Sequence, residues 1–144
     1  MSSAERLYTP ELLGWTVRLA AYRLAEDLPL AGEARSPSCG STISLTLDTD
    51  DMGAISAIGM RVSACAIGQA SAAVFAEHAV GRDAEEIASS LAEMEAWVAG
   101  EGALPGWPDL KVIAPARDFP GRHGAMLLPW KAALAALSKA EAAG

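Results

Sequence analysis

The side chains best suited to metal chemistry are two cysteines, Cys39 and Cys65, and the chain has no others. Cys39 lies between Ser38 and Gly40, directly ahead of a stretch in which apolar and polar residues alternate. Cys65 stands where a second stretch of this kind turns into an expected helix. A thiolate at a helix start faces unpaired backbone N–H groups, which favours its charged form and its binding to a metal. We therefore expect the two cysteines to form half of a metal site.

The composition bounds the kind of protein that carries these cysteines. At 144 residues, 51% hydrophobic and 20% charged, the chain suits one domain, residues 1–144, with a real core. A net charge of -7 without any basic run argues against a nucleic-acid partner. No stretch has the apolar core of a signal peptide or the roughly 20 apolar residues of a membrane span. We expect a cytoplasmic protein with free thiols or ligand cysteines rather than a structural disulfide, and the sequence does not indicate its oligomeric state.

Two alternating stretches predict a β-hairpin over about residues 42–62. The apolar positions fall on one face of each strand, which is the period of a half-buried strand. Ile55 is out of parity with the second strand, so we expect a bulge or a frayed start there. The residues from Gly32 to Ser38 are expected to form an extended strand that approaches Cys39. The apolar face of the hairpin consists of Ile43, Leu45, Leu47, Ile58, Met60 and Val62.

Helices are predicted on both sides of this hairpin. Thr9 and Pro10 are typical of a helix start, and an apolar stripe follows at Leu13, Val17, Ala20 and Leu24. Further helices are expected over 67–80, from a cap at Asp83, and over 126–142, with a short helical turn at 110–114. We place Pro129 in the first turn of the last helix, where proline is tolerated. A helix, a hairpin and then helices predict an α+β fold, with a small antiparallel sheet packed against the helices.

The order of several short motifs gives the chain a family resemblance. The loop Ser36-Pro37-Ser38-Cys39-Gly40 precedes a strand, and Cys65 opens a helix rich in small residues. Near the C-terminus follow Phe119-Pro120-Gly121-Arg122 and Leu128-Pro129-Trp130-Lys131-Ala132. In this order the motifs resemble the U-type iron–sulfur cluster assembly scaffolds (IscU, SufU and the N-terminal domain of NifU), the SufU-like branch in particular. The resemblance runs from Leu7 to Leu137 and implies the α+β fold of that family.

The resemblance also implies a ligand set, which this chain keeps only in part. The family uses three cysteines and an aspartate, because iron–sulfur clusters and zinc take soft thiolate donors and four-coordinate geometry. The first two cysteines fall on Cys39 and Cys65. The aspartate falls on Ser41, and the third cysteine falls on Ala125, neither of which supplies the expected donor.

His123 is the candidate that could compensate, since imidazole is a good ligand for zinc and iron. It lies two residues before Ala125 on a glycine-rich stretch. The alternative interpretation is a solvated surface histidine. For Cys39 and Cys65, the alternative is that they are buried small apolar residues.

The resemblance predicts a scaffold or carrier, not an enzyme, that binds iron, an iron–sulfur cluster or zinc through Cys39 and Cys65. The expected partners are a cysteine desulfurase or a recipient apo-protein. A second hypothesis is a degenerate family member that keeps the fold and the partner surface but holds no cluster. Such a protein would act in interaction or regulation.

Overall fold

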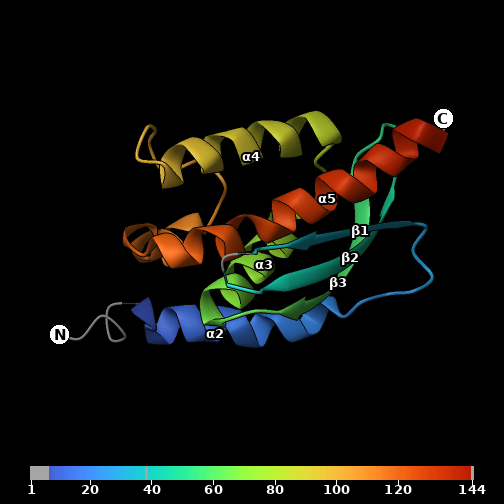
Figure 1. The fold of residues 1–144 in the computed structure, drawn as a ribbon. Helices are drawn as coiled ribbons and strands as arrows, with labels where there is room; N and C mark the ends of the chain where they lie inside the picture. The colour runs from blue at the N-terminus through green and yellow to red at the C-terminus, as the bar shows by residue number, and fades with distance from the viewer. Residues whose placement is uncertain (1–6, 38, 144) are drawn as a thin grey trace.

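A three-stranded antiparallel sheet lies at the centre of the molecule, with helices packed against it (Figure 1). The computed structural model describes residues 7–37 and 39–143. The elements follow the expected α+β order. In chain order they are α2 (Pro10–Arg18), η1 (Leu19–Tyr22), β1 (Leu30–Arg35), β2 (Thr42–Thr49), β3 (Ile55–Ser63), α3 (Ala66–Ala79), α4 (Ala84–Val98), η2 (Leu110–Asp118), η3 (Pro120–Arg122) and α5 (His123–Ala143).

The predicted hairpin is confirmed together with its register. β2 is the central strand, and it pairs Leu47 with Ile58 and Leu45 with Met60, so the apolar positions of both strands share one face. A strand register of this kind is fixed because a slip by one residue would turn every apolar side chain to the other face. The irregularity expected near Ile55 is also present. Asp48 pairs with Ala57 and Thr49 with Ile55, which leaves Ser56 as an extra residue on β3.

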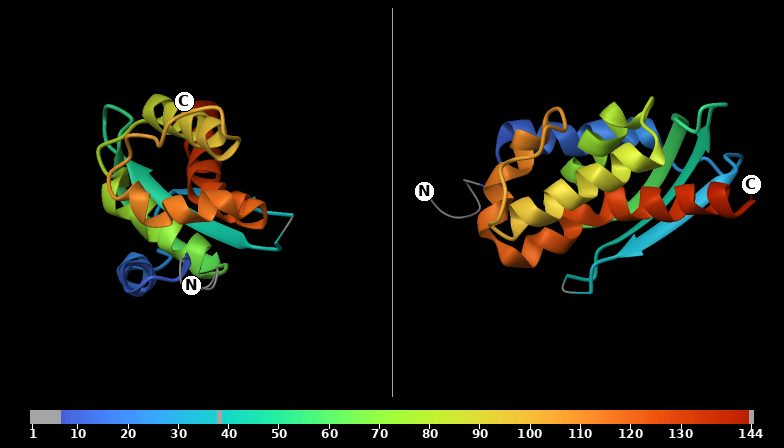
Figure 2. Two further views of the ribbon diagram at one scale, coloured as in Figure 1. Left: turned by 90° about the vertical axis from the view of Figure 1, so that its left-hand side faces the viewer. Right: turned by 90° about the horizontal axis from the view of Figure 1, so that it is seen from above.

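The extended stretch before Cys39 is the edge strand β1, antiparallel to β2. Helix α5 packs so closely on it that a Cβ at Gly32 would lie 2.1 Å from the carbonyl oxygen of Ala132. Glycine is therefore required at this position by the approach of two backbones. Helix α3 packs against α5 and β3, α4 packs on the outer side of α5, and α2 packs on α3, as the views in Figure 2 show.

The first helix differs from the prediction in length and in its buried face. It ends at Arg18 and continues as the 3-10 turn η1, whereas the sequence indicated a helix that continues to Leu24. Leu13 and Val17 are 45% and 73% exposed, so the predicted stripe is wrong. The side chains that face the core stand one or two positions earlier, at Leu12, Trp15, Leu19 and Tyr22.

The last helix begins earlier than predicted. It starts at His123 and places Pro129 in its interior instead of its first turn. Because proline has no N–H, Pro129 cannot donate to the carbonyl of Ala125. In the next residue, the carbonyl of Met126 accepts a hydrogen bond of 2.7 Å from Ser71 Oγ on α3. This bond joins the two helices at the interrupted turn.

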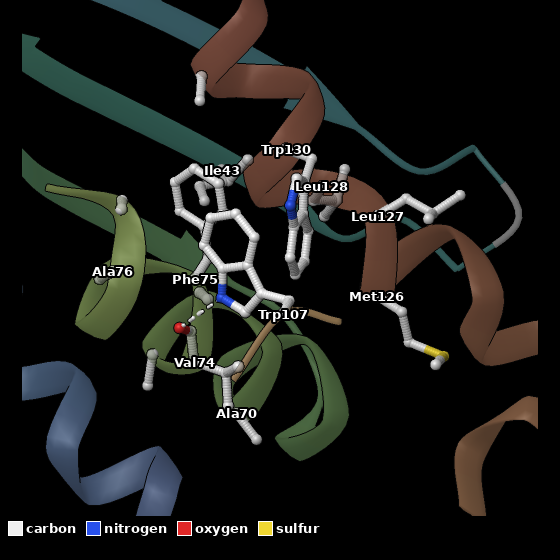
Figure 3. Close-up of a cluster of buried hydrophobic side chains, with 14 of the residues drawn as sticks. Ile43, Ala70, Val74, Phe75, Ala76, Trp107, Met126, Leu127, Leu128 and Trp130 are labelled. Carbon is white, nitrogen blue, oxygen red and sulfur yellow. Dashed lines mark hydrogen bonds between the residues drawn. The ribbon is translucent and has the colours of Figure 1, made fainter. Parts of the chain in front are cut away.

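Trp107 and Trp130 are buried in the core. Phe75 of α3 stacks on Trp107, and the ring of Trp130 from α5 meets both edge-on, with centroids 5.1–5.2 Å apart (Figure 3). Trp107 donates its Nε1 hydrogen to the carbonyl of Val74 at 3.1 Å. Of the side chains placed in the structure, Trp130 Nε1 is the one buried polar atom without a hydrogen-bond partner, and it lies among these rings. This cluster fixes the start of α5 against α3. Within the described part of the chain, no helix has the length and apolar character needed to cross a membrane.

Candidate functional site

Cys39 lies on the turn that joins β1 to β2. Two backbone hydrogen bonds close this turn: Ser36 N–H donates to the carbonyl of Ser41 at 2.9 Å, and Gly40 N–H donates to the carbonyl of Ser36 at 2.8 Å. Gly40 has φ +72°, a left-handed conformation that glycine adopts without strain. Ser36 and Ser41 are buried inside the turn, whereas Cys39 is exposed on its outer side.

The Cys39 sulfur sits between two serine hydroxyls. It donates to Ser36 Oγ at 3.3 Å and lies 3.1 Å from Ser41 Oγ, where either atom can be the donor. Hydrogen bonds with Ser36 and Ser41 lower the pKa of the Cys39 thiol, against a smaller opposing effect of desolvation. The positive charge of Arg122 lowers this pKa further. The turn therefore favours the thiolate, which is the form that binds metals and attacks electrophiles.

Cys65 is the N-cap residue of α3, with φ -64° and ψ 171°, and its side chain forms no capping hydrogen bond. Its sulfur is half-buried. The last pair of the β2–β3 ladder is Thr42 with Ser63, so Cys65 follows two residues after the ladder ends. Cys39 precedes Thr42 by three residues on the paired strand. The two cysteines thus lie at the same end of the sheet.

Ala125 packs against the first turn of α3. It is fully buried, and a Cβ at Gly68 would lie 3.3 Å from the Cβ of Ala125 and 2.6 Å from that of Ala64. Gly68 stands three residues after Cys65 and therefore on the same side of the helix. The position aligned with the third family cysteine is accordingly adjacent to the start of α3, and it is filled by a methyl group.

His123 is the first residue of α5, and its ring is held by the backbone. Its Nε2 lies 2.6 Å from the carbonyl oxygen of Arg117. A carbonyl only accepts hydrogen bonds, so Nε2 carries a hydrogen, and Nδ1 is the ring nitrogen left for another contact. Metal-binding histidines commonly donate their second ring N–H to a carbonyl in this way. The geometry is compatible with a ligand role for Nδ1, which stays a prediction.

Arg122, the residue before His123, connects this end of the sheet to the N-terminal segment. Its Nη2 donates to the Tyr8 hydroxyl at 3.2 Å. In the sequence, Arg122 stands out only as part of a motif, and neither its contact with Tyr8 nor the role of Ser36 is evident there. The serines before Cys39 were the available signal for a hydrogen bond to its sulfur. That bond forms only when the turn is closed.

The described residues do not assemble a complete metal site in one chain. No group of three or more His, Cys, Asp or Glu side chains among residues 7–37 and 39–143 comes together in a way that could hold a metal ion. Cys39, Cys65 and His123 therefore do not form a ready three-donor site in this conformation. One chain presents two thiols and, at the position aligned with the aspartate, the hydroxyl of Ser41. By number, these thiols supply at most two of the four donors that a tetrahedral iron or zinc ion takes.

No family model matches the chain, but comparison with known proteins finds relatives in sequence and in fold. It is 30% identical over 115 residues to the iron–sulfur cluster assembly scaffold protein IscU of Thermotoga maritima, covering 79% of this chain and 80% of that protein. The fold matches the N-terminal part of a nitrogen-fixing NifU-like protein from Brucella abortus with a TM-score of 0.89 at 26% identity, over 99% of this chain and 100% of the other.

The fold is also shared with a putative scaffold protein of the SUF system from Fervidobacterium islandicum. There the TM-score is 0.77 at 23% identity, over 91% of this chain and 96% of the other. The level of identity and coverage with the IscU protein, together with the shared fold, shows that the chain belongs to the U-type iron–sulfur cluster assembly scaffold family.

Proposed function

We propose that the protein is an iron–sulfur cluster assembly scaffold or carrier that binds iron, a cluster or zinc through Cys39 and Cys65. The observation that carries this proposal is the pairing of an exposed thiol in a turn that lowers its pKa with a second thiol at a helix start, at one end of the sheet. Family membership supports the same assignment. The metal or cluster is cargo, so the protein acts by binding and transfer rather than as an enzyme.

The hydroxyls of Ser36 and Ser41 lower the pKa of Cys39 and so favour the thiolate, which is the form that binds a metal. Each thiol must lose its proton when it coordinates, so a lowered pKa makes the metal-bound form easier to reach near neutral pH. Once Cys39 has lost its proton, its sulfur only accepts, and hydrogen bonds donated by the hydroxyls of Ser36 and Ser41 support its negative charge. The expected partners are a cysteine desulfurase as sulfur donor and an apo-protein as recipient, as the resemblance implies.

Metal analysis of protein purified without oxygen tests this proposal. The wild-type protein is expected to contain iron or zinc, or to take up a coloured cluster when ferric iron and sulfide are added. Cys39→Ser and Cys65→Ser should each lose most of the bound metal. His123→Ala tests whether this histidine is a ligand, and His78→Ala is its matched control. His78 pairs with Asp109 at 2.7 Å and belongs to no part of this site. Wild-type protein that binds neither metal nor cluster would refute the proposal.

A second function follows from the same ligand deficit. Ala125 is buried against α3 and Ser41 carries no carboxylate, so neither supplies the missing metal donor. A chain that receives no donor from another molecule would then hold no cluster. In that case the protein keeps the family's fold and partner surface and acts in interaction or regulation. Binding to a cysteine desulfurase that is unchanged in Cys39→Ser and Cys65→Ser, together with the absence of metal, distinguishes this alternative.

A further inference from the structure

The solvent face of α2 carries apolar residues where a surface helix usually carries polar ones. Leu13 is 45% exposed and Val17 is 73% exposed, and Pro10 and Gly14 are exposed beside them. At 3.6 residues per turn these four positions share one side of the helix, opposite the side that packs on the core. Exposed apolar side chains that gather in one place mark contact sites with other molecules.

Gly14, in the middle of this face, has no packing role within the described part of one chain. Glycine in a helix interior lowers stability relative to alanine. Among the described residues nothing lies within 4 Å of a Cβ added at Gly14, so no close approach requires glycine there, in contrast to Gly32. The distance between two packed helices depends on the side chains at their contact, and a glycine lets the backbones come close. A second helix on this face would give Gly14 that role.

Two opposite charges flank the apolar face of α2 on the same side. Glu11 and Arg18 are both exposed and lie about two helical turns apart. The Arg18 guanidinium lies 4.3 Å from the centre of the Trp15 ring, which holds it along this flank. Within residues 7–37 and 39–143, neither Glu11 nor Arg18 forms an ion pair. A two-fold axis perpendicular to α2, midway between them, sets Glu11 of each copy beside Arg18 of the other. The face is therefore complementary to itself in charge.

We propose that α2 binds a second copy of this chain, with the two α2 helices packed antiparallel about a two-fold axis. A dimer of this symmetry joins the same surface of both copies, and it is the commonest form of protein oligomer. In this arrangement Leu13 of one copy lies between Gly14 and Val17 of the other. Glu11 pairs with Arg18 on the flank, twice. In a parallel pair the charged flanks point to opposite sides, so the charges select the antiparallel arrangement.

This contact leaves the thiols of both copies open. The start of α2 lies at the thiol end of the sheet, because Arg122, whose charge acts on Cys39, donates a hydrogen bond to Tyr8. Antiparallel helices point these ends in opposite directions. In Figure 1, α2 lies at the lower margin of the molecule, where a second copy can reach it. The dimer therefore needs neither cysteine nor metal, and the inference is independent of the scaffold function proposed above.

Sedimentation equilibrium in a buffer with chelator and reductant measures the association. The wild-type chain is expected to form a reversible dimer, with the same Kd in Cys39→Ser. Val17→Lys buries an unpaired charge in the contact and should weaken the dimer at least about tenfold. Met52→Lys is the matched control, because Met52 is an 87% exposed apolar residue in the β2–β3 turn, and it should leave the Kd unchanged. Circular dichroism confirms that each variant is folded.

Charge reversal tests the arrangement of the two helices. Glu11→Arg and Arg18→Glu each replace both ion pairs by like-charge contacts, and each should weaken self-association at least about tenfold. A mixture of the two variants restores both pairs, so it should form a mixed dimer with a Kd near that of the wild-type protein. Glu95→Arg makes the same change of charge as Glu11→Arg, but on the exposed face of α4, and should have no effect.

Three outcomes would overturn this inference. The first is a wild-type protein that stays monomeric at about 1 mM chain, where even a millimolar Kd gives a dimer. The second is a dimer that forms only after iron or zinc is added, since the α2 contact uses neither thiol. The third is a loss of the dimer in both charge variants that their mixture does not restore, because the copies then do not pair through Glu11 and Arg18. None of these results bears on metal binding by Cys39 and Cys65, which is tested separately.

Discussion

The sulfur of Cys39 lies 3.1 Å from the hydroxyl oxygen of Ser41, the residue on which the family aspartate falls by resemblance. A carboxylate this close to a thiol would raise the pKa of the thiol through like-charge repulsion, whereas a hydroxyl lowers it by hydrogen bonding to the thiolate. The substitution thus removes a possible metal donor and at the same time makes Cys39 a better thiolate.

Removal of this hydroxyl should raise the pKa of Cys39. In Ser41→Ala the thiolate loses one hydrogen bond, so the pH midpoint for alkylation of Cys39 by iodoacetamide should move upward. The sign follows because hydrogen bonds to the charged form favour it. The measurement is best made in a Cys65→Ser background, in which Cys39 is the one thiol. Ser63→Ala, an exposed serine at the end of β3, is the control and should leave the midpoint unchanged. A downward shift in Ser41→Ala would contradict the proposed role of the hydroxyl.

The environment of Cys39 shows why sequence reasoning reached only part of the site. The ends of the strands could be predicted from alternation, so the common location of Cys39 and Cys65 followed. Ser36 and Cys39 are three residues apart, a spacing with no chemical meaning until Gly40 adopts a positive φ and closes the turn. The effect of the Arg122 charge on the pKa of Cys39 requires two segments far apart in the sequence to lie close together. Periodicity does not encode such contacts.

The two errors in the fold have local causes. In the first helix, two apolar stripes offset by one or two positions were available. The one containing Trp15 is buried, because a large aromatic ring removes more apolar surface from water than Leu13 or Val17 does. In the last helix, Pro129 was assigned to the first turn because proline usually breaks a helix interior. Packing of α5 on α3 and the bond from Ser71 to the carbonyl of Met126 stabilise the earlier start.

Two glycine substitutions should separate close packing from helix propensity. Gly32→Ala would place a methyl group 2.1 Å from the backbone of α5, and the resulting overpacking should destabilise the fold by about 1–3 kcal/mol. Gly14→Ala is the matched control, because nothing lies within 4 Å of its added methyl group. It replaces a glycine in a helix interior and should be neutral or stabilising by up to about 1 kcal/mol. Urea denaturation measures both, and equal effects would contradict the packing of α5 on β1.

A charge on the inner face of the sheet should unfold the protein. Leu45 is 1% exposed at the centre of β2, so Leu45→Asp would bury an unpaired carboxylate at a cost of several kcal/mol. Ser44→Asp places the same charge on the opposite face of the same strand and should be tolerated. Thermal unfolding followed by circular dichroism is the measurement. A Leu45→Asp variant with unchanged thermal stability would show that this face does not form the core.

The ligand role of His123 can be tested apart from its structural role. His123→Ala removes both Nδ1 and the hydrogen bond to Arg117, whereas His123→Gln keeps an amide that can donate to that carbonyl but offers only a weak metal donor. If His123 binds metal, both variants should weaken zinc binding in a competition assay with a chromogenic chelator. If only His123→Ala has an effect, the histidine positions the start of α5 and is not a ligand.

The last prediction concerns Ala125 and Ser41 together. By resemblance, a cysteine and an aspartate of the family fall on these two positions, and Ala125 packs against Gly68 in the first turn of α3. The wild-type chain should bind zinc weakly, because two thiolates and at most one histidine leave a tetrahedral ion short of protein donors. Ala125→Cys with Ser41→Asp should bind zinc at least about tenfold more tightly, which corresponds to about 1.4 kcal/mol. Ala125→Ser with Ser41→Asn, close in size but without the thiolate and the carboxylate, is the control. If the double cysteine and aspartate variant gains nothing while His123→Ala abolishes binding, the alignment of the third ligand is wrong. The natural site would then consist of Cys39, Cys65 and His123.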